Sequence, residues 1–448
     1  MADVVIRGGL VVSATGARIT DVAVEDGRFC AVGPELPGAE LEINAHGLAV
    51  LPGLIDVHLH FNEPGRTHWE GISTGSSALA AGGGTLFFDM PLNSTPCTLD
   101  GASFELKHQA MDRSSITDFA LWGGLTPNNL ESLDELAECG VIGFKAFMCD
   151  SGLPEFARAD ELTLQRGMLV AARWGLPVAV HAESEEMTKA LTARIRSSGG
   201  KGVRDYLESR PVLAELEAIE RAASIAKDTG ARLHIVHVSS GRGVALAVQL
   251  RASGVDLTIE TCPHYLFFTE QDLEEIGAAA KCSPPLRSAE EREALWDAVL
   301  GDGVDIIASD HSPAPPELKT DADFFKLWGG IAGVQSTLGV LLEGSHRRRL
   351  SLSRITQLTA AAPARRFHIL NKGAIEIGLD ADCTLVELDT PYTVSADELM
   401  YRHKSSPYLG KQLRGIVRRT FLRGRTIYRD GLIQASRMGQ LVRPAGGE

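Results

Sequence analysis

The sequence lacks the features of membrane, secreted and disulfide-rich proteins. None of its apolar runs approaches the roughly 20 residues that span a bilayer, and its first residues, MADVVIRGGL, lack the regions of a secretory signal. The seven cysteines are scattered and never form a Cys-x-x-Cys pair, which argues against a disulfide framework and a thiolate zinc site. We therefore expect a cytoplasmic protein with reduced thiols.

An excess of positive charge is missing as well. The chain has 44 Lys and Arg against 58 Asp and Glu, a formal net charge of −14. This balance leaves no basic stripe for phosphates or anionic lipid, so we expect no nucleic acid and no membrane as partner. The sequence also has no Gly-x-Gly-x-x-Gly after a strand and no Walker A pattern, which argues against a nucleotide cofactor. A small-molecule substrate remains.

The two ends of the chain share a pattern of short apolar segments and turns that the middle does not have. Residues 1–50 alternate short Val, Ile and Ala runs with Gly and Asp turns, and residues 373–448 return to strand-like segments and the turn Asp430-Gly431. We predict that both ends meet in one small β-rich domain. The larger domain then covers residues 51–372.

Short apolar runs alternate with helical stretches through this larger domain. The stretch before the sixth run shows the helical pattern, with Pro211 at a first helical position and Gly230 as its stop. Such alternation implies parallel strands joined by crossovers, and eight units fit a (β/α)8 TIM barrel better than an open doubly wound sheet. The eight runs are 54–60, 84–90, 118–125, 143–148, 177–183, 232–239, 256–264 and 305–311.

Metal-binding residue types end several of these runs, where the active sites of such barrels lie. His58 and His60 end the first run and, two residues apart on a strand, can reach the same point. His181 ends the fifth run, His237 the sixth and Asp310 the eighth. Four histidines and a carboxylate at matching strand ends predict a site for a first-row divalent metal rather than unrelated polar residues.

Lys145 is unusual because it lies inside the apolar run 143–148. An isolated ammonium is costly to bury unless it is paired or loses its charge. From the residues alone, three interpretations stay open. Lys145 forms a buried salt bridge, for example to Asp89 or Glu183, or it is a catalytic amine, or it takes up carbon dioxide to give a carbamate that can bridge two metal ions.

Other polar residues near the strand ends have less certain roles. His234, three residues before His237, is predicted on the opposite strand face, packed against a helix, and His311 should also point away from the site. Asp56 either orients a ligand or satisfies backbone groups. His264, at the end of the seventh run, is a substrate contact or a structural residue. Residues 62–66 are predicted to form a loop over the site.

Together the motifs resemble the cyclic amidohydrolases of the amidohydrolase superfamily, and among them the allantoinase family. The resemblance rests on HLHFNEPGRTHWEG (58–71), DMPLNS (89–94), GFKAFMCDSG (143–152), SDHSPAPPELK (309–319) and WGGIAG (328–333). It implies a TIM barrel with a small β-sandwich built from both termini, and a homotetramer. It also implies two divalent metal ions, zinc first and Co, Mn, Fe or Ni as alternatives, held by His58, His60, carboxylated Lys145, His181, His237 and Asp310.

The same resemblance implies a reaction and a set of substrate contacts. Metal-activated hydroxide would open the ring of allantoin to give allantoate in ureide catabolism, with Asp310 carrying the proton from the attacking hydroxide to the leaving nitrogen. The implied substrate contacts are Asn62, Asn93, Ser283, His264, Ser312 and Gly330.

Two residues separate the allantoinase family from its neighbours. Dihydroorotases carry an arginine where this chain has Asn62, and hydantoinases and dihydropyrimidinases carry a tyrosine where it has Asp150. An amide side chain suits a neutral ring, whereas dihydroorotate would lose its charge-assisted clamp. Activity as one of these other cyclic amidases is the alternative. A non-catalytic scaffold is disfavoured, because all six ligand positions are filled.

Overall fold

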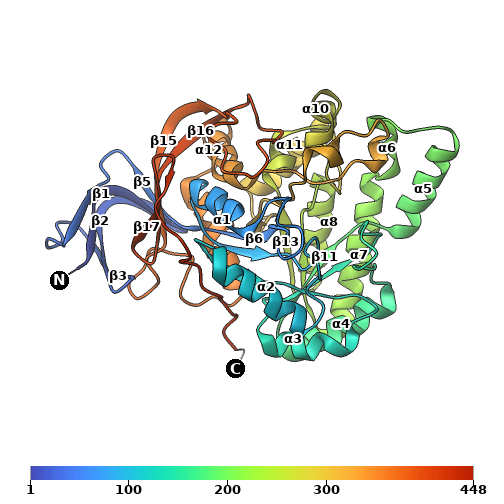
Figure 1. Cartoon of the computed structure of the whole chain (residues 1–448), viewed down its shortest axis with the longest axis horizontal. Helices are drawn as coiled ribbons and strands as arrows, with labels where there is room; N and C mark the ends of the chain where they lie inside the picture. Colours follow the sequence, from blue (N-terminus) through green and yellow to red (C-terminus); the bar gives the residue numbers. More distant parts are fainter. Residues whose placement is uncertain (1, 447–448) are drawn as a thin grey trace.

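The computed structural model describes residues 2–446, and it consists of a barrel surrounded by helices with a sheet from both chain ends beside it (Figure 1). The barrel strands pair only in parallel, in one sheet of order β6-β7-β8 and a second of order β14-β13-β12-β11-β10-β9. They are β6 (Leu54–Leu59), β7 (Gly84–Asp89), β8 (Asp118–Leu121), β9 (Gly123–Gly124), β10 (Phe144–Phe147), β11 (Pro177–His181), β12 (Arg232–Ile235), β13 (Leu257–Thr261) and β14 (Ile306–Ile307).

The two parallel sheets form one closed barrel. Strands β8 and β9 are the two halves of the third predicted run, so the first sheet continues into the second. A parallel bridge from Leu59 to His311 and a hydrogen bond from the His60 N–H to the His311 carbonyl join the last run to the first. The predicted eight-unit (β/α)8 barrel is thereby confirmed.

The helices lie between the strands in sequence and around them in space. The longest, α7 (Val212–Thr229), begins one residue after Pro211, which is its N-cap rather than its predicted first helical residue. It ends at Gly230, as predicted, where a φ of 69° favours glycine. The others are α1 (Ile72–Ala81), α2 (Gly101–Ser114), α3 (Leu133–Cys139), α4 (Glu161–Trp174), α5 (Glu185–Ser197), α6 (Val203–Ser209), α8 (Gly241–Ala252), α9 (Pro263–Phe267), α10 (Glu270–Ile276), α11 (Ala289–Leu300), α12 (Thr337–Arg348), α13 (Leu352–Thr356) and α14 (Ala362–Arg366).

Alternation along the barrel strands produces two apolar cores. Phe87 belongs to a large cluster that also contains Ile219 of α7, so this face of the strands packs against the helices. Its neighbours on β7, Leu86 and Phe88, belong to a second cluster on the other face, inside the barrel. Phe367, directly after α14, fills the same inner cluster. The barrel is therefore a packed core that leaves its chemistry to the strand ends.

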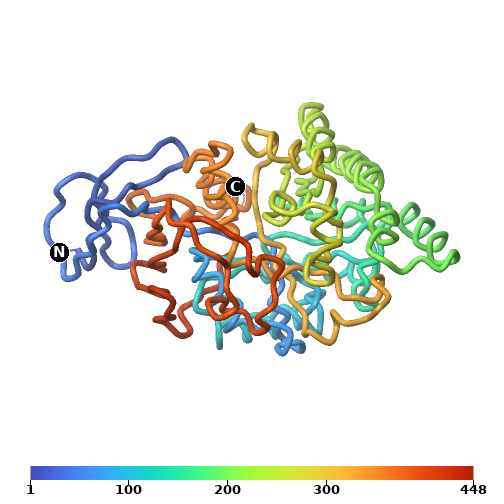
Figure 2. The backbone as a smooth tube through the Cα atoms, turned by 90° about the horizontal axis from the view of Figure 1, so that it is seen from above, coloured from blue at the N-terminus to red at the C-terminus, as the bar shows by residue number. Residues whose placement is uncertain are grey.

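The two chain ends form one nine-stranded sheet, of order β18-β17-β16-β15-β5-β1-β2-β3 with β4 beside β1. Antiparallel pairing of β5 with β15, for example Leu51 with Thr384, joins the first part of the chain to the last. The first and last strands lie at the same end of the molecule (Figure 2). These strands are β1 (Val4–Ser13), β2 (Gly16–Glu25), β3 (Arg28–Gly33), β4 (Leu41–Asn44), β5 (Ala49–Pro52), β15 (Cys383–Thr393), β16 (Gln412–Leu422), β17 (Arg425–Arg429) and β18 (Leu432–Ile433).

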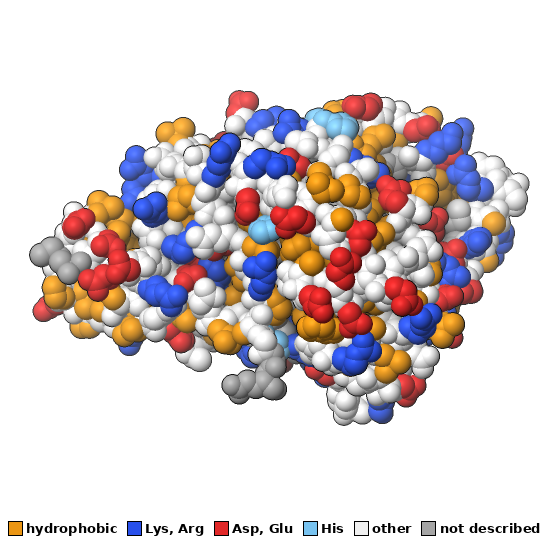
Figure 3. All heavy atoms as spheres, turned by 60° about the horizontal axis from the view of Figure 1, so that its bottom comes forward, with side chains coloured by type: hydrophobic (Ala, Val, Ile, Leu, Met, Phe, Trp, Pro, Cys, Tyr) orange, Lys and Arg blue, Asp and Glu red, His pale blue; other side chains and the backbone are white. Residues whose placement is uncertain are grey.

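This sheet folds over an apolar core of its own, which includes Ile6, Phe29, Val50, Leu385 and Phe421. It forms the small β-sandwich that the sequence predicts. On the face of the molecule shown in Figure 3, acidic and basic side chains are interspersed rather than gathered by sign. Within residues 2–446, no helix combines the length and the hydropathy that a membrane span requires.

Candidate metal centre

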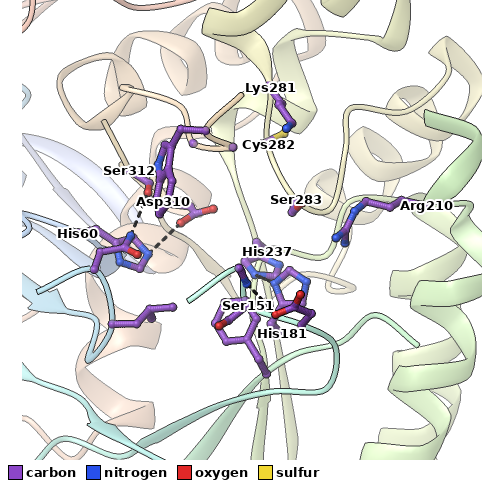
Figure 4. Close-up of a pocket in the computed structure, with 18 of the residues that line it drawn as sticks. His60, Ser151, His181, Arg210, His237, Lys281, Cys282, Ser283, Asp310 and Ser312 are labelled. Carbon is purple, nitrogen blue, oxygen red and sulfur yellow. Dashed lines mark hydrogen bonds and ion pairs between the residues drawn. The ribbon is translucent and has the colours of Figure 1, made fainter. Parts of the chain in front are cut away.

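The carboxyl ends of five barrel strands place the predicted ligands around one cavity of about 370 Å³ (Figure 4). Two ligands lie within their strands, one is the last residue of its strand, and three follow their strands. All six line this cavity: His58 in β6, His60 after it, Lys145 in β10, His181 ending β11, His237 beyond β12 and Asp310 beyond β14.

Several residues at the strand ends have left-handed backbone conformations. The φ angles are 41° for His237, 44° for Asp310, 64° for Asn62 and 70° for Asn93. Non-glycine residues adopt such angles at a cost of order 1–3 kcal/mol, and they cluster at functional sites. The chain therefore leaves strand geometry where the candidate ligands turn into the cavity.

The turn at His237 also corrects the predicted position of His234. His234 does not pack against a helix. It is buried inside the barrel, where its ring stacks on Trp122 at 6.4 Å and its Nε2 lies 3.0 Å from Glu260. The strand alternation that separates residues three apart ends at Ile235, so both histidines point inward.

His58, His60 and Asp310 form the first group of donor atoms. The Nε2 atoms of His58 and His60 lie 3.3 Å and 3.5 Å from the same oxygen of Asp310. His58 Nδ1 lies 2.8 Å from a carboxylate oxygen of Glu260, which assigns the proton of a neutral imidazole to Nδ1 and the lone pair to Nε2. A lone pair and a carboxylate oxygen then face each other, an arrangement that a cation between them would stabilise.

His181 and His237 form the second group. His181 Nε2 lies 2.8 Å from Glu183, so the lone pair of a neutral ring is on Nδ1, which lies 3.0 Å from His237 Nε2. Burial lowers the pKa of His181, and burial together with His181 and Lys145 lowers that of His237 well below its usual value. Both rings are therefore held neutral, as metal ligands must be.

Lys145 is fully buried, and its Nζ has no hydrogen-bond partner among the described residues. Burial lowers its pKa to about 8. The salt bridge considered from the sequence is wrong, because both candidate partners are taken. Asp89 pairs with Lys107 at 2.6 Å, and Glu183 pairs with Arg210 at 2.5 Å. Lys145 is therefore a buried amine without a hydrogen-bond partner among the described residues, and it lies beside two groups of candidate metal-ligating atoms.

The residues present therefore fit a metal centre. Imidazole nitrogens and a carboxylate are the ligands that first-row divalent ions prefer. Each group presents lone pairs to the cavity and hydrogen-bonds at least one imidazole to a buried glutamate, the arrangement that fixes a ligating histidine. Three described residues, His58, His60 and Asp310, offer donor atoms that all lie within 4.8 Å of one another.

The sequence reasoning missed the role of Glu260. Its carboxylate accepts from His58 Nδ1, from His234 Nε2 at 3.0 Å and from the His237 N–H at 3.1 Å. Burial favours the neutral acid, but His58 and His234 outweigh it and lower the pKa of Glu260. A glutamate inside the apolar run 256–264 was the available signal, since a buried charge requires partners.

Two further polar residues support the backbone around the site. Asp56 accepts from the backbone N–H groups of His58 and Ser309, which favours the simpler of its two interpretations. His311 points away from Asp310 as expected, and its Nδ1 accepts from the Gly333 N–H at 3.1 Å. Both hold chain segments that carry candidate ligands.

The predicted substrate contacts divide into two sets. Asn93, Ser283, Ser312 and Gly330 line the cavity. Asn62 and His264 are buried but are not among the residues that line it, and the Asn62 amide lies 3.4 Å from the Pro313 carbonyl. The cavity wall also contains residues that no motif indicated, among them Tyr206, Arg210 and Lys281.

The chain is similar to known proteins over nearly its whole length. The model of the amidohydrolase family matches residues 49–427. A relative from Solibacter usitatus named allantoinase is 62% identical over 445 residues, which cover 99% of this chain and 97% of the relative. One of that name from Rubrobacter xylanophilus is 54% identical over 99% of this chain and 98% of its own.

Solved structures agree with the fold. The L-hydantoinase (dihydropyrimidinase) from Arthrobacter aurescens superposes with a TM-score of 0.96 at 33% identity, covering 99% of this chain and 100% of its own. A dihydropyrimidinase from Brevibacillus agri superposes with a TM-score of 0.92 at 28% identity, with both chains fully covered.

Proposed function

This chain belongs to the amidohydrolase family, and on that premise we propose that it is an allantoinase, which hydrolyses the cyclic amide of allantoin to give allantoate in ureide catabolism. The observation that carries the proposal is the 62% identity, over 99% of the chain, to a relative named allantoinase. The cavity supports it, since the six candidate ligands and uncharged polar residues such as Asn93 and Ser283 all line it.

The proposed centre holds two divalent ions through His58, His60, His181, His237, Asp310 and carboxylated Lys145. Zinc is the first choice, and Co, Mn, Fe and Ni are alternatives. When bound, such ions lower the pKa of a water molecule and polarise a carbonyl oxygen. The glutamates behind the imidazoles, Glu260 and Glu183, keep the ligating lone pairs aimed into the cavity.

Carboxylation of Lys145 would account for a buried amine that has no hydrogen-bond partner among residues 2–446. The ammonium first loses one proton to solvent. The neutral Nζ then attacks the carbon of carbon dioxide, so that an N–C bond forms, one C=O π bond breaks with its electron pair moving to oxygen, and the nitrogen releases a second proton. The product is an anionic group with two oxygens. With a pKa of about 8, a part of the amine is neutral at physiological pH and able to react.

Asp310 is suited to move a proton in this reaction. Burial favours its neutral form, but His58 and His60 outweigh it and lower its pKa, so the carboxylate is ionised and able to accept a proton. Its oxygen lies at the cavity surface beside both imidazoles. From there it can take a proton from the attacking water and give it to the departing ring nitrogen.

Hydantoinase or dihydropyrimidinase activity is the second candidate, favoured by the superposition with a TM-score of 0.96. Against it stands Asp150, which is exposed and occupies the position of the tyrosine in those families. A dihydroorotase is disfavoured by Asn62, which cannot pair with a substrate carboxylate as an arginine does.

The proposal extends to the organisation of the protein. We expect a cytoplasmic homotetramer that has neither nucleic acid nor a membrane as partner. The net charge of −14 and the mixed surface charges support the second expectation (Figure 3). We also propose that residues 51–372 are the hydrolase domain, and that residues 1–50 and 373–448 form the small domain.

A direct comparison of substrates tests the function. Protein prepared with divalent metal and bicarbonate is assayed on allantoin, dihydroorotate, hydantoin and dihydrouracil, and we expect the highest kcat/KM for allantoin. An equal or higher value for another ring would contradict the substrate assignment while leaving the family unchanged. Metal content well below one ion per chain, with no gain after adding metal and bicarbonate, would instead favour a scaffold.

A further inference from the structure

One cationic side chain in the cavity wall has no assigned role. Arg210 directly follows α6, and its guanidinium points toward His181 and Ser283 (Figure 4). The same cavity is lined by Tyr206 of α6 and by the candidate metal ligands. The side chain is 20% exposed, so it is accessible from the cavity. A charged group this close to the metal ligands can contact whatever the cavity binds.

The guanidinium is held in place from behind. Its Nη1 donates to Glu183 Oε2 at 2.5 Å, and the same carboxylate oxygen lies 2.8 Å from His181 Nε2. The guanidinium carbon lies 5.8 Å from the centre of the Tyr206 ring, and the backbone carbonyl of Arg210 accepts from Arg287. Glu183 raises the pKa of Arg210 although burial opposes it, so the group stays charged.

The remaining donors of Arg210 are available to a ligand. A guanidinium has five N–H groups in a rigid fork. Among the described residues, Glu183 accepts from Nη1 and the thiol of Cys149 lies beside the group. An uncharged carbonyl oxygen suits the remaining N–H groups of Arg210, because Glu183 already neutralises the charge of the guanidinium. A charge-assisted hydrogen bond from these groups needs no second anion.

Allantoin carries such an oxygen in the right place. Its ureido group stands on the ring carbon next to the carbonyl that is hydrolysed. A ring with that carbonyl at the metal ligands therefore has its ureido group only a few bonds away. Arg210 is equally close to the ligands, since one carboxylate oxygen of Glu183 links it to His181.

We propose that Arg210 is a specificity-determining residue whose guanidinium, fixed by Glu183, donates hydrogen bonds to the ureido carbonyl oxygen of the substrate. This inference rests on the proposed function and names the contact that distinguishes allantoin from other rings of the same shape. A hydantoin with an alkyl substituent would leave the guanidinium N–H groups of Arg210 without an acceptor in a desolvated pocket, which is strongly unfavourable.

The alternative is that Arg210 only positions His181 through Glu183. Both roles predict lower activity when Arg210 is replaced, so total activity does not separate them. The ratio of two substrates does. The side chains of allantoin and 5-isobutylhydantoin have similar size and branching, but the alkyl side chain lacks the carbonyl oxygen and also the two nitrogen groups of the ureido side chain. Because both are assayed on one preparation, the ratio of their kcat/KM values does not depend on metal content or on the folded fraction.

The test uses Arg210→Met, Arg210→Lys and a matched control, Arg204→Met, which lies within α6, the helix that Arg210 follows. Arg204 is paired with Glu270 and Glu274 at the surface and does not line the cavity. We expect Arg210→Met to lower the allantoin to isobutylhydantoin ratio roughly 10- to 100-fold, the loss typical of a hydrogen bond to a charged group. Arg210→Lys should lower it less, and the control should leave it unchanged.

The outcomes separate the two levels of inference. A wild-type protein that does not prefer allantoin contradicts the proposed function. A wild-type preference for allantoin that persists in Arg210→Met, with both kcat/KM values falling in parallel, overturns the role of Arg210 alone. If isobutylhydantoin is not hydrolysed, its Ki as a competitive inhibitor replaces its kcat/KM and is compared with the KM for allantoin.

Discussion

Replacing Lys145 with methionine should have opposite effects on the metal-free and the metal-loaded protein. In the metal-free protein, the ammonium of Lys145 is fully buried and has no hydrogen-bond partner among the described residues. Methionine has a similar length and no charge, so it removes this unfavourable group. In the loaded protein the same change removes a proposed ligand. The variant should therefore be more stable than the wild type without metal and less stable with it.

The magnitude follows from the pKa of the lysine. Burial lowers it from 10.5 to about 8, and each unit corresponds to about 1.4 kcal/mol, so keeping the ammonium charged at pH 7 costs about 3 kcal/mol. At about 2.1 cal/mol/K per residue, the unfolding entropy of a 448-residue chain makes this a rise in Tm of about 3 °C. A measurable shift of this sign is the first expected result.

The pH dependence supplies an independent check. The folded pKa lies below the unfolded one, so the folded wild type binds fewer protons and gains stability as the pH rises from about 8 to 10.5. The variant has no such group. Its advantage should therefore be complete below pH 8 and should disappear by about pH 10.5.

The assay is thermal unfolding of both proteins, first with a chelator in buffer free of carbon dioxide, then with divalent metal and bicarbonate. A wild type that is more stable than Lys145→Met under both conditions would show that the amine is not an unfavourable buried cation. The reasoning from burial to carboxylation would then fail.

Three other substitutions test buried charged groups, two at the site and one away from it. Glu260→Gln removes the charged acceptor behind His58 and should weaken metal binding and kcat/KM about 10- to 100-fold, measured by metal titration and kinetics; an unchanged metal affinity would exclude a positioning role. Lys145→Ala should be inactive and partly rescued by short-chain carboxylates, and full activity without rescue would exclude a carbamate. Lys372 is buried and its Nζ lies within 3.0 Å of Asp118, Asp380 and Asp382. Lys372→Met leaves these carboxylates without this cation and should lower the free energy of unfolding by about 3–5 kcal/mol in denaturant unfolding. A loss below about 1 kcal/mol would mean that the three carboxylates move apart or become protonated.

The positions of the candidate ligands along the strands could be predicted from the sequence, because they depend on local spacing. Apolar runs of period two and helical stretches between them indicated the barrel, and residue types at the run ends indicated His58, His60, His181, His237 and Asp310. Where the chain left regular geometry, this reasoning failed. β12 ends at Ile235, and the left-handed φ of 41° at His237 brings that residue to the same side as His234, against the alternation that the sequence suggested.

The partners of buried charged side chains could not be predicted from the sequence in this way. The contact between His58 and Glu260 joins residues 202 positions apart, and the short runs in which they lie do not indicate it. The sequence marked Lys145 as a buried lysine with several open explanations. Only the fold showed that Lys107 and Arg210 occupy the two candidate carboxylates, which left the amine unpaired.

The sequence by itself therefore determined the strand and helix order, the excess of acidic residues, the lack of a long apolar run, and five candidate ligands at the strand ends, while the role of Lys145 stayed open. The tertiary structure decided which imidazole nitrogen each glutamate fixes, which carboxylates are occupied, and that Arg210 reaches the cavity. The physical reason is that periodicity and residue type are local properties. The compensation of a buried charge depends instead on every group that folding brings within a few ångströms of it.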